Sequence, residues 1–351
     1  SNLGSLYSVI GQLDKAEIYF RKSIEIDPKV PESYSNLSYV FKEIGKFDAA
    51  EAAILEAIKL SPENNQFKSN LIELLTMYNS RNINLSPLIK INDEYRNLNI
   101  ISHKLISDNH IVNIYREGLN IFKKYNLKLD TPSSQIMKTN EINLNCKRHM
   151  FIFDEYKIIP EFCFGCYKVL IEPTSIIDLL KLFCLFSNIK FKNNNIRKCM
   201  IEMRPNISGL YKGFIYCRGL EDAYDVTRII NLKIKDNISD SLVAIIKRGC
   251  SEYAIDFPKY KEIRNSPIQP MNYNNNWRKI EYDFDKTHNS WPDVSTNIEG
   301  FSLHSFLVIR NWIAYAQKVG DKSVDKITNE IIKLPKSFVE FNSTSRKINN
   351  I

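Results

Sequence analysis

The phrase Ile10-Gly11-Gln12-Leu13-Asp14-Lys15-Ala16 returns 34 residues later as Ile44-Gly45-Lys46-Phe47-Asp48-Ala49-Ala50. Pro28 and Pro62 stand at the same offset from one another, so the repetition extends beyond the two phrases. A fixed period of this length is typical of a solenoid built from two-helix units. The N-terminal part of the chain is therefore predicted to be an all-α solenoid.

Each phrase holds the residue types that a tight connection between antiparallel helices requires. Gly11 and Gly45 fall at the expected turn, where a positive φ costs little only for glycine. Ala16 and Ala50 are small enough to let neighbouring helices approach closely. The large residues expected to fill the space between helices are Tyr7, Phe20, Phe41 and Ile54.

These features resemble the tetratricopeptide repeat (TPR) family. The family's pattern of small and large residues is matched at Leu3, Gly4, Tyr7, Ala16, Phe20 and Pro28, and again at Tyr34, Leu37, Phe41, Ala50, Ala57 and Pro62. Ser38 replaces the usual small glycine. A third unit keeps only Leu71 and Leu75, so residues 1–79 are predicted to be repeats closed by a capping helix. Because a solenoid usually needs at least about three repeats, more repeats are expected upstream.

The resemblance implies that a protein or peptide binds in a concave groove lined by the first helix of each repeat. The candidate partner-binding residues on these helices are Asn2, Tyr7, Asn36, Tyr39 and Lys68. The alternative is that they are ordinary exposed polar residues.

Length and charge limit the remaining possibilities. A chain of 351 residues suggests two or three domains. The net charge of +8 accompanies an abundance of Lys, Asn and Ile, so a solvated basic surface is the default and a nucleic-acid partner the alternative. The longest apolar stretch, residues 176–186, is interrupted by Asp178 and Lys181 and is too short to span a bilayer. No membrane association is expected.

All seven cysteines lie between Cys146 and Cys250. An odd number in a chain of this size does not fit a secreted disulfide framework, and it favours reduced thiols in a cytoplasmic protein. Beyond the repeats, we expect a helical connector over residues 80–145, a cysteine-rich α+β domain over 146–300, and a C-terminal helix and tail over 301–351.

Four side chains in the cysteine-rich domain have metal-ligand spacing. Cys146-x2-His149 is followed after 13 residues by Cys163-x2-Cys166. Zinc is usually held by four such ligands in two knuckles. With a hairpin turning at Asp154-Glu155, this stretch would be a zinc-ribbon-like insertion. The alternative is that the cysteines are small core residues.

The order of elements after Cys166 predicts a βαββαβ arrangement. Strands are expected at 167–171, 198–203, 211–217 and 242–246, and helices at 173–186 and 221–234, with Ser175 and Asp178 at the start of the first helix. This order is that of a ferredoxin-like fold. The whole chain is therefore predicted to be α+β, with an all-α solenoid in front.

Strand alternation places basic and aromatic residues on one face of the expected sheet. The nucleic-acid candidates on this face are Lys198, Arg204, Lys212, Phe214, Tyr216 and Arg218. Lys212-Gly213-Phe214-x-Tyr216 partly resembles the aromatic motif of RNA-recognition domains, although Cys217 and Gly219 depart from it. The alternative is that another segment covers this face, or that it is only solvated.

One cysteine is a weak candidate for catalysis. Cys250 lies in Arg248-Gly-Cys-Ser-Glu-Tyr253, at the end of the last expected strand, where a thiolate would need His288 or His304 as its base. A structural cysteine at a turn is favoured, and the chain carries no common catalytic or phosphate-binding motif. The sequence thus favours an interaction adaptor or scaffold, with a nucleic-acid binder and a cysteine-dependent enzyme as alternatives.

Overall fold

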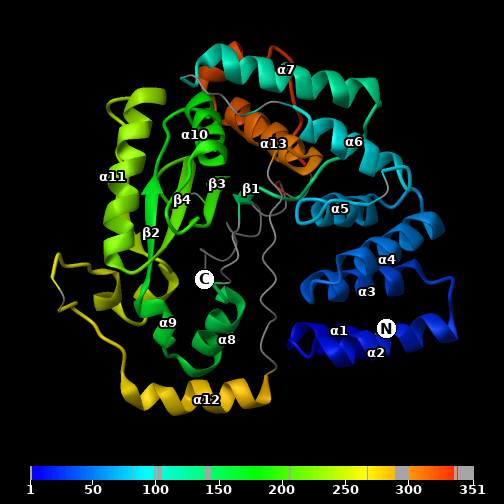
Figure 1. Cartoon of the computed structure of the whole chain (residues 1–351), viewed down its shortest axis with the longest axis horizontal. Coiled ribbons are helices and arrows are strands. Elements are labelled where there is room, and N and C mark those ends of the chain that lie inside the picture. Colours follow the sequence, from blue (N-terminus) through cyan, green and yellow to red (C-terminus); the bar gives the residue numbers. More distant parts are fainter. Residues whose placement is uncertain are drawn as a thin grey trace. The chain divides into compact units, whose positions relative to one another are not determined.

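The computed structural model describes residues 2–81, 83–98, 100, 105–138, 144–204, 207–266, 268–288, 300–335 and 338 (Figure 1). The chain forms two compact units, and their sequences interleave. The first unit is Ser1–Ile89, Asn140–Tyr167 and Lys247–Ile298; the second is Lys90–Thr139, Lys168–Ile246 and Glu299–Ile351. Neither unit coincides with the contiguous ranges expected from the sequence.

The first unit opens with five helices stacked in chain order. They are α1 (Asn2–Val9), α2 (Leu13–Ile26), α3 (Pro31–Glu43), α4 (Phe47–Leu60) and α5 (Asn65–Leu74). Each packs on the next, and the turns before α2 and α4 contain Gly11 and Gly45 at φ 76° and 77°. The helix pairs and their glycine turns are therefore placed as the 34-residue period predicts.

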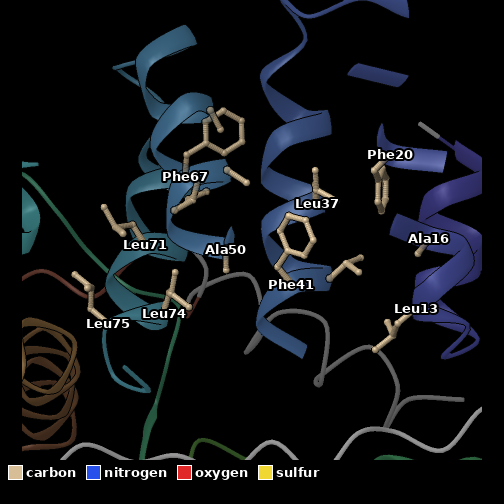
Figure 2. Packing of buried hydrophobic residues seen from close by; sticks show 14 of the residues in the cluster. Leu13, Ala16, Phe20, Leu37, Phe41, Ala50, Phe67, Leu71, Leu74 and Leu75 are labelled. Atoms are coloured by element: carbon tan, nitrogen blue, oxygen red, sulfur yellow. The ribbon is translucent and has the colours of Figure 1, made fainter. Parts of the chain in front are cut away.

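Small residues decide how closely these helices pack. Ala16, Ala50 and Ala57 have no exposed surface, and Phe20 and Phe41 fill the space beside them. Figure 2 shows this cluster running from Leu13 in α2 to Leu74 and Leu75 at the end of α5, with Ala16, Phe20, Phe41 and Ala50 between them. Asn64 caps the start of α5, since its side chain accepts the amide of Gln66, and this helix closes the repeats as the expected capping helix.

The rest of the first unit is built from helices. It contains α8 (Cys146–Tyr156), α9 (Glu161–Phe164), η1 (Glu252–Ala254), η2 (Pro258–Lys261), η3 (Asn275–Trp277) and α12 (Arg278–Thr287). The hairpin expected over residues 146–166 is wrong. His149, Ile152 and Phe153 are buried at helical spacing, so this stretch buries one helix face instead of alternating strand faces.

The second unit is organised around a five-stranded sheet of order β1-β3-β4-β2-β5. Its strands are β1 (Gln135–Lys138), β2 (Cys166–Ile171), β3 (Arg197–Ile201), β4 (Tyr211–Arg218) and β5 (Ile245–Arg248). β3 pairs antiparallel with β1 and with β4, and its Lys198 lies opposite Phe214. The α+β character of this region is confirmed. The strand β1 was missed, since only four residues form it inside a stretch of helical pattern.

Two helices connect the strands. α10 (Ile176–Asn188) follows β2, and α11 (Leu220–Asn237) follows β4; both pack on β4 and on each other. The Oγ of Ser175 accepts the amide of Asp178 at 3.2 Å, so the capping position predicted for Ser175 is confirmed, although the helix begins at Ile176 and not at residue 173. Cys199, Ile201, Ile215 and Cys217 are buried, as expected for the sheet face that meets the helices.

Three further helices complete the second unit. They are α6 (Pro87–Arg96), α7 (Asp108–Lys124) and α13 (Leu303–Val319), followed by η4 (Lys322–Lys326). α6 begins in the first unit's sequence range and continues into the second. The side chains of Trp312 and Asn311 in α13 donate to backbone carbonyls of Ser134 and Thr131, both at 2.8 Å. Within the described residues, no helix is both long and apolar enough to cross a bilayer.

Candidate functional site

The predicted partner-binding residues lie on the first helices of the helix pairs. Asn2 is exposed on α1, Asn36 is half-buried on α3 and Lys68 is half-buried on α5. Asn36 stands 34 residues after Asn2, so the two occupy equivalent positions in successive repeats. Among the described residues, neither the two amide groups nor the ammonium of Lys68 has a hydrogen-bond or ion-pair partner.

The two tyrosines of the predicted set already have contacts within the first unit. The ring of Tyr7 stacks on Tyr19 with centroids 5.2 Å apart, and it packs against the repeat core. Tyr39 is 38% exposed, but Lys147 at the start of α8 lies 3.3 Å from its hydroxyl. The same ammonium is 2.8 Å from a carboxylate oxygen of Glu43. These contacts leave the asparagines as the more available part of the set.

One residue of this surface was missed by the sequence reasoning. Asn70 on α5 continues the 34-residue spacing of Asn2 and Asn36. Its amide nitrogen donates to the Oγ of Ser35 at 3.1 Å, and its oxygen accepts from Gln66 at 2.9 Å. The signal that could have identified it is the same offset that located the repeats.

Comparison with known families bears on these helices. Two tetratricopeptide repeat family models match residues 1–30 and 19–52. The N-terminal region is a TPR region. TPR repeats indicate a role in protein–protein interaction, and Asn2 and Asn36 lie on the first helices of the two matched repeats. No curated protein matches the chain.

Two of the four predicted zinc ligands, Cys163 and Cys166, lie at the start of β2, but the four do not form a finished site. Cys146 is exposed at the first turn of α8, whereas Cys163 and Cys166 are buried. His149 is buried with its ring stacked on Phe162, centroids 5.1 Å apart. Among the residues that the structure describes, no three His, Cys, Asp or Glu side chains are arranged to hold a metal ion.

Burial sets the protonation of these groups. It lowers the pKa of His149 to about 4, and the charge of Arg148 acts in the same direction. It also raises the pKa of the Cys163 thiol far above its usual range. Without a bound cation, the imidazole and this thiol are therefore both neutral at pH 7.

The positive charge on the basic sheet face is neutralised to a greater extent than its sequence suggests. Glu202 is buried and binds Arg204 at 2.8 Å and Lys212 at 3.5 Å. Phe214 is only 9% exposed, and the ammonium groups of Lys168 and Lys198 lie over its ring at 5.4 and 5.2 Å. A base could stack on Phe214 only after these lysines moved. Nucleic-acid binding stays a prediction.

The two remaining candidates on this face are more accessible. Arg218 is exposed at the end of β4, and Tyr216 is half-buried on the same strand. Their place on the face agrees with strand alternation. Two adjacent groups offer a small part of the extended basic and aromatic surface that single-stranded nucleic acids require.

The catalytic alternative rests on Cys250, which packs against an apolar cluster containing Cys163 and Tyr253. Of the two possible bases, His288 lies at the end of α12 with its ring stacked on Phe284 at 3.9 Å. Its Nδ1 is 3.2 Å from the carbonyl of Phe284. His304 belongs to the second unit. These positions favour neither His288 nor His304 as the base for a Cys250 nucleophile.

A polar hollow lies elsewhere in the second unit. It measures about 280 Å³ and includes the carboxylates of Glu172 and Asp178 and the hydroxyls of Ser239 and Ser241 in its lining. Its volume is slightly below the range of typical small-molecule sites, which begins at roughly 300 Å³. The sequence contained no motif that pointed to it.

Proposed function

We propose that this protein is an interaction adaptor whose TPR region holds an extended segment of a partner protein. The observation that carries the proposal is the ladder of asparagines Asn2, Asn36 and Asn70, placed once per repeat on the first helices. An asparagine amide both donates and accepts, so it matches the N–H and C=O of a peptide unit. A ladder spaced by one repeat can therefore hold a peptide main chain at successive points.

The amide of Asn36 has the central place in this proposal. Asn36 lies on α3, which packs on α2 on one side and on α4 on the other, and its amide has no hydrogen-bond partner among the described residues. A peptide bound there would gain hydrogen bonds without first breaking any made by Asn36. Lys68 on α5 adds a positive charge that would favour an acidic residue in the bound segment.

Site-specific photo-crosslinking tests the proposal. A photoreactive amino acid at position 36 should capture a partner segment, whereas the same group at Glu25, exposed on the outer helix α2, should not. The captured segment, synthesised as a peptide, should bind Asn36→Ala about tenfold more weakly than the wild type, as expected for roughly 1.4 kcal/mol of lost hydrogen bonding. Equal capture from both positions, or an unchanged affinity, would count against a groove role.

For the second unit, we infer a ferredoxin-like domain that supplies another recognition surface. The support is the strand order: β2 and β4, the first and third strands of the βαββαβ run, are neighbours, while β3 and β5 flank them. β1 extends the sheet beyond β3. An experimental structure with β2 and β4 separated would contradict this topology.

A further inference from the structure

Cysteines from three separate segments of the first unit meet where β2 begins. The amide of Gly249, directly after β5, donates to the carbonyl of Cys166 at 3.0 Å. A Cβ atom added to Gly249 would overlap the Sγ of Cys166, so this thiol lies against the backbone next to Cys250. A side chain at position 249 would push apart the segment that holds Cys166 and the segment that holds Cys250. Glycine is therefore required at this position.

Two more cysteines lie close to this point. Cys163 and Cys250 pack in one cluster with Tyr253 and Tyr260, and the Sγ of Cys163 is 3.4 Å from the hydroxyl of Tyr253. Met150 and Phe153 of α8, the helix that Cys146 opens, pack in this same cluster. Segments that carry four cysteines therefore pack together here, although their positions span much of the sequence.

A buried cation beside these thiols has no ion-pair partner in the part of the chain that the structure describes. Arg248 is 4% exposed, and it donates to the carbonyls of Phe164 and Tyr260 at 2.7 and 3.1 Å and to the hydroxyl of Tyr167 at 2.9 Å. Its guanidinium also lies over the rings of Tyr167 and Tyr260. Among the described residues, all of these partners are neutral. A buried cation is costly unless an anionic group compensates it.

We infer that Cys163, Cys166 and Cys250, completed by Cys146, bind a zinc ion in a closed tetrahedral site. Four thiolates around Zn²⁺ carry a net charge of 2−, which would compensate the neighbouring Arg248. Arg248 also holds the carbonyl of Phe164, so it positions the backbone between Cys163 and Cys166. The ligand set differs from the one predicted from spacing: Cys250 takes the place of His149.

The exclusion of His149 follows from its surroundings. Its ring is buried against Phe162 within α8 and α9, so turning it toward the thiols would break that packing. The thiols are not arranged as a ligand cage among the described residues of the metal-free chain, so zinc binding would require them to turn toward one another. Zinc binding would release their protons, since thiolates are the form that coordinates.

Such a site would be structural. With four protein ligands no coordination position is left for substrate, and the ion would join α8, the start of β2 and the segment after β5. Thiolate ligands favour zinc over the hard cations magnesium and calcium. This role is independent of partner binding by the TPR region.

Metal analysis of the full-length protein tests the inference. Protein produced with zinc in the medium should contain about one zinc ion per chain, and X-ray absorption should show sulfur ligands only. Cys250→Ala should lose most of the zinc. Cys184→Ala, a buried cysteine of α10, should retain it, and so should His149→Phe, which keeps a ring against Phe162.

Three results would overturn the proposal. One is folded wild-type protein with negligible zinc and seven titratable thiols after denaturation. Another is loss of zinc from His149→Phe together with its retention in Cys250→Ala. The third, which does not depend on any variant folding, is a nitrogen ligand in the X-ray absorption spectrum of the wild type.

Discussion

At the scale of single residues, Gly118 in α7 shows how closely the second unit is packed. An alanine Cβ at this position would lie 2.6 Å from two ring carbons of Phe306, and the carbonyl of Gly118 accepts the hydroxyl of Tyr95 at 2.8 Å. Replacing a helical glycine by alanine normally gains up to about 1 kcal/mol, but overpacking a buried ring costs roughly 1–3 kcal/mol. The packing cost is the larger of the two.

Gly118→Ala is therefore expected to lower the free energy of unfolding by about 1–2 kcal/mol. Urea denaturation followed by circular dichroism measures this. Gly165→Ala is the control, because the nearest atom to its added Cβ is 3.7 Å away and its φ of −93° suits any residue. A stabilised Gly118→Ala variant would show that Phe306 moves aside without cost.

Asp321 connects three elements of the second unit. It accepts hydrogen bonds from the hydroxyl of Tyr211 at 2.7 Å and from the amides of Ile176 at 2.6 Å and Ser323 at 2.9 Å. Burial alone would raise the pKa of Asp321, but these hydrogen bonds outweigh it and hold the pKa below its usual range. The carboxylate thus contributes stability above the unfolded-state pKa of about 3.9, and this is lost as pH falls through the lower folded-state pKa.

Asp321→Asn should cost about 1–2 kcal/mol at pH 7, an amount reduced for the partial exposure of the group. The difference from wild type should shrink as the pH falls below about 4. Thermal unfolding across this range tests the sign. The exposed Asp325→Asn is the control, and a deficit that stayed constant at low pH would contradict the linkage.

At the scale of elements, the C-terminal end of α10 depends on Arg197. Its guanidinium donates to the carbonyls of Phe186 and Ile189, and it is only 2% exposed. These carbonyls have no partner within the helix, so a donor from outside is required. Arg197 therefore closes a helix from inside the core instead of adding to the basic surface.

Arg197→Met keeps the bulk of the side chain and removes the donors. Because two buried carbonyls are left unsatisfied, the expected loss is about 2–4 kcal/mol of unfolding free energy. Lys190→Met, an exposed basic residue nearby, should change it by less than about 0.5 kcal/mol. Chemical denaturation of both variants makes the comparison, and equal effects would mean that Arg197 contributes only hydrophobic contact.

At the scale of the whole molecule, the two units draw on different parts of the chain. Removing C-terminal residues should therefore destabilise one unit more than the other. α13 supplies Trp312 and Phe306 to the core of the second unit, and the hydroxyl of its Tyr315 donates to the carbonyl of Glu202 at 2.7 Å. The TPR core, in contrast, runs from Leu13 to Ile89, and the described partly buried side chains packed against it lie between Tyr7 and Leu88.

A chain ending at residue 298 should therefore lose protease protection over residues 168–246 while the TPR helices stay protected. Limited proteolysis with mass spectrometry measures this region by region. A chain ending at residue 338 retains α13 and should resemble the full length. Unchanged protection after the shorter truncation would show that the sheet is stable without α13.

The sequence alone determined the TPR helices, their glycine turns and most of the βαββαβ run, because these depend on spacing within one segment. The spacing of apolar residues did not distinguish the expected hairpin from the helix α8. The reason is that the burial of Ile152 and Phe153 depends on residues that are distant in the chain. The sequence also did not predict that Arg197 and Arg248 are buried, or that Cys250 lies beside Cys166. Burial and the meeting of remote segments are properties of the packed chain, so only the tertiary structure decided which charges are compensated and which thiols are neighbours.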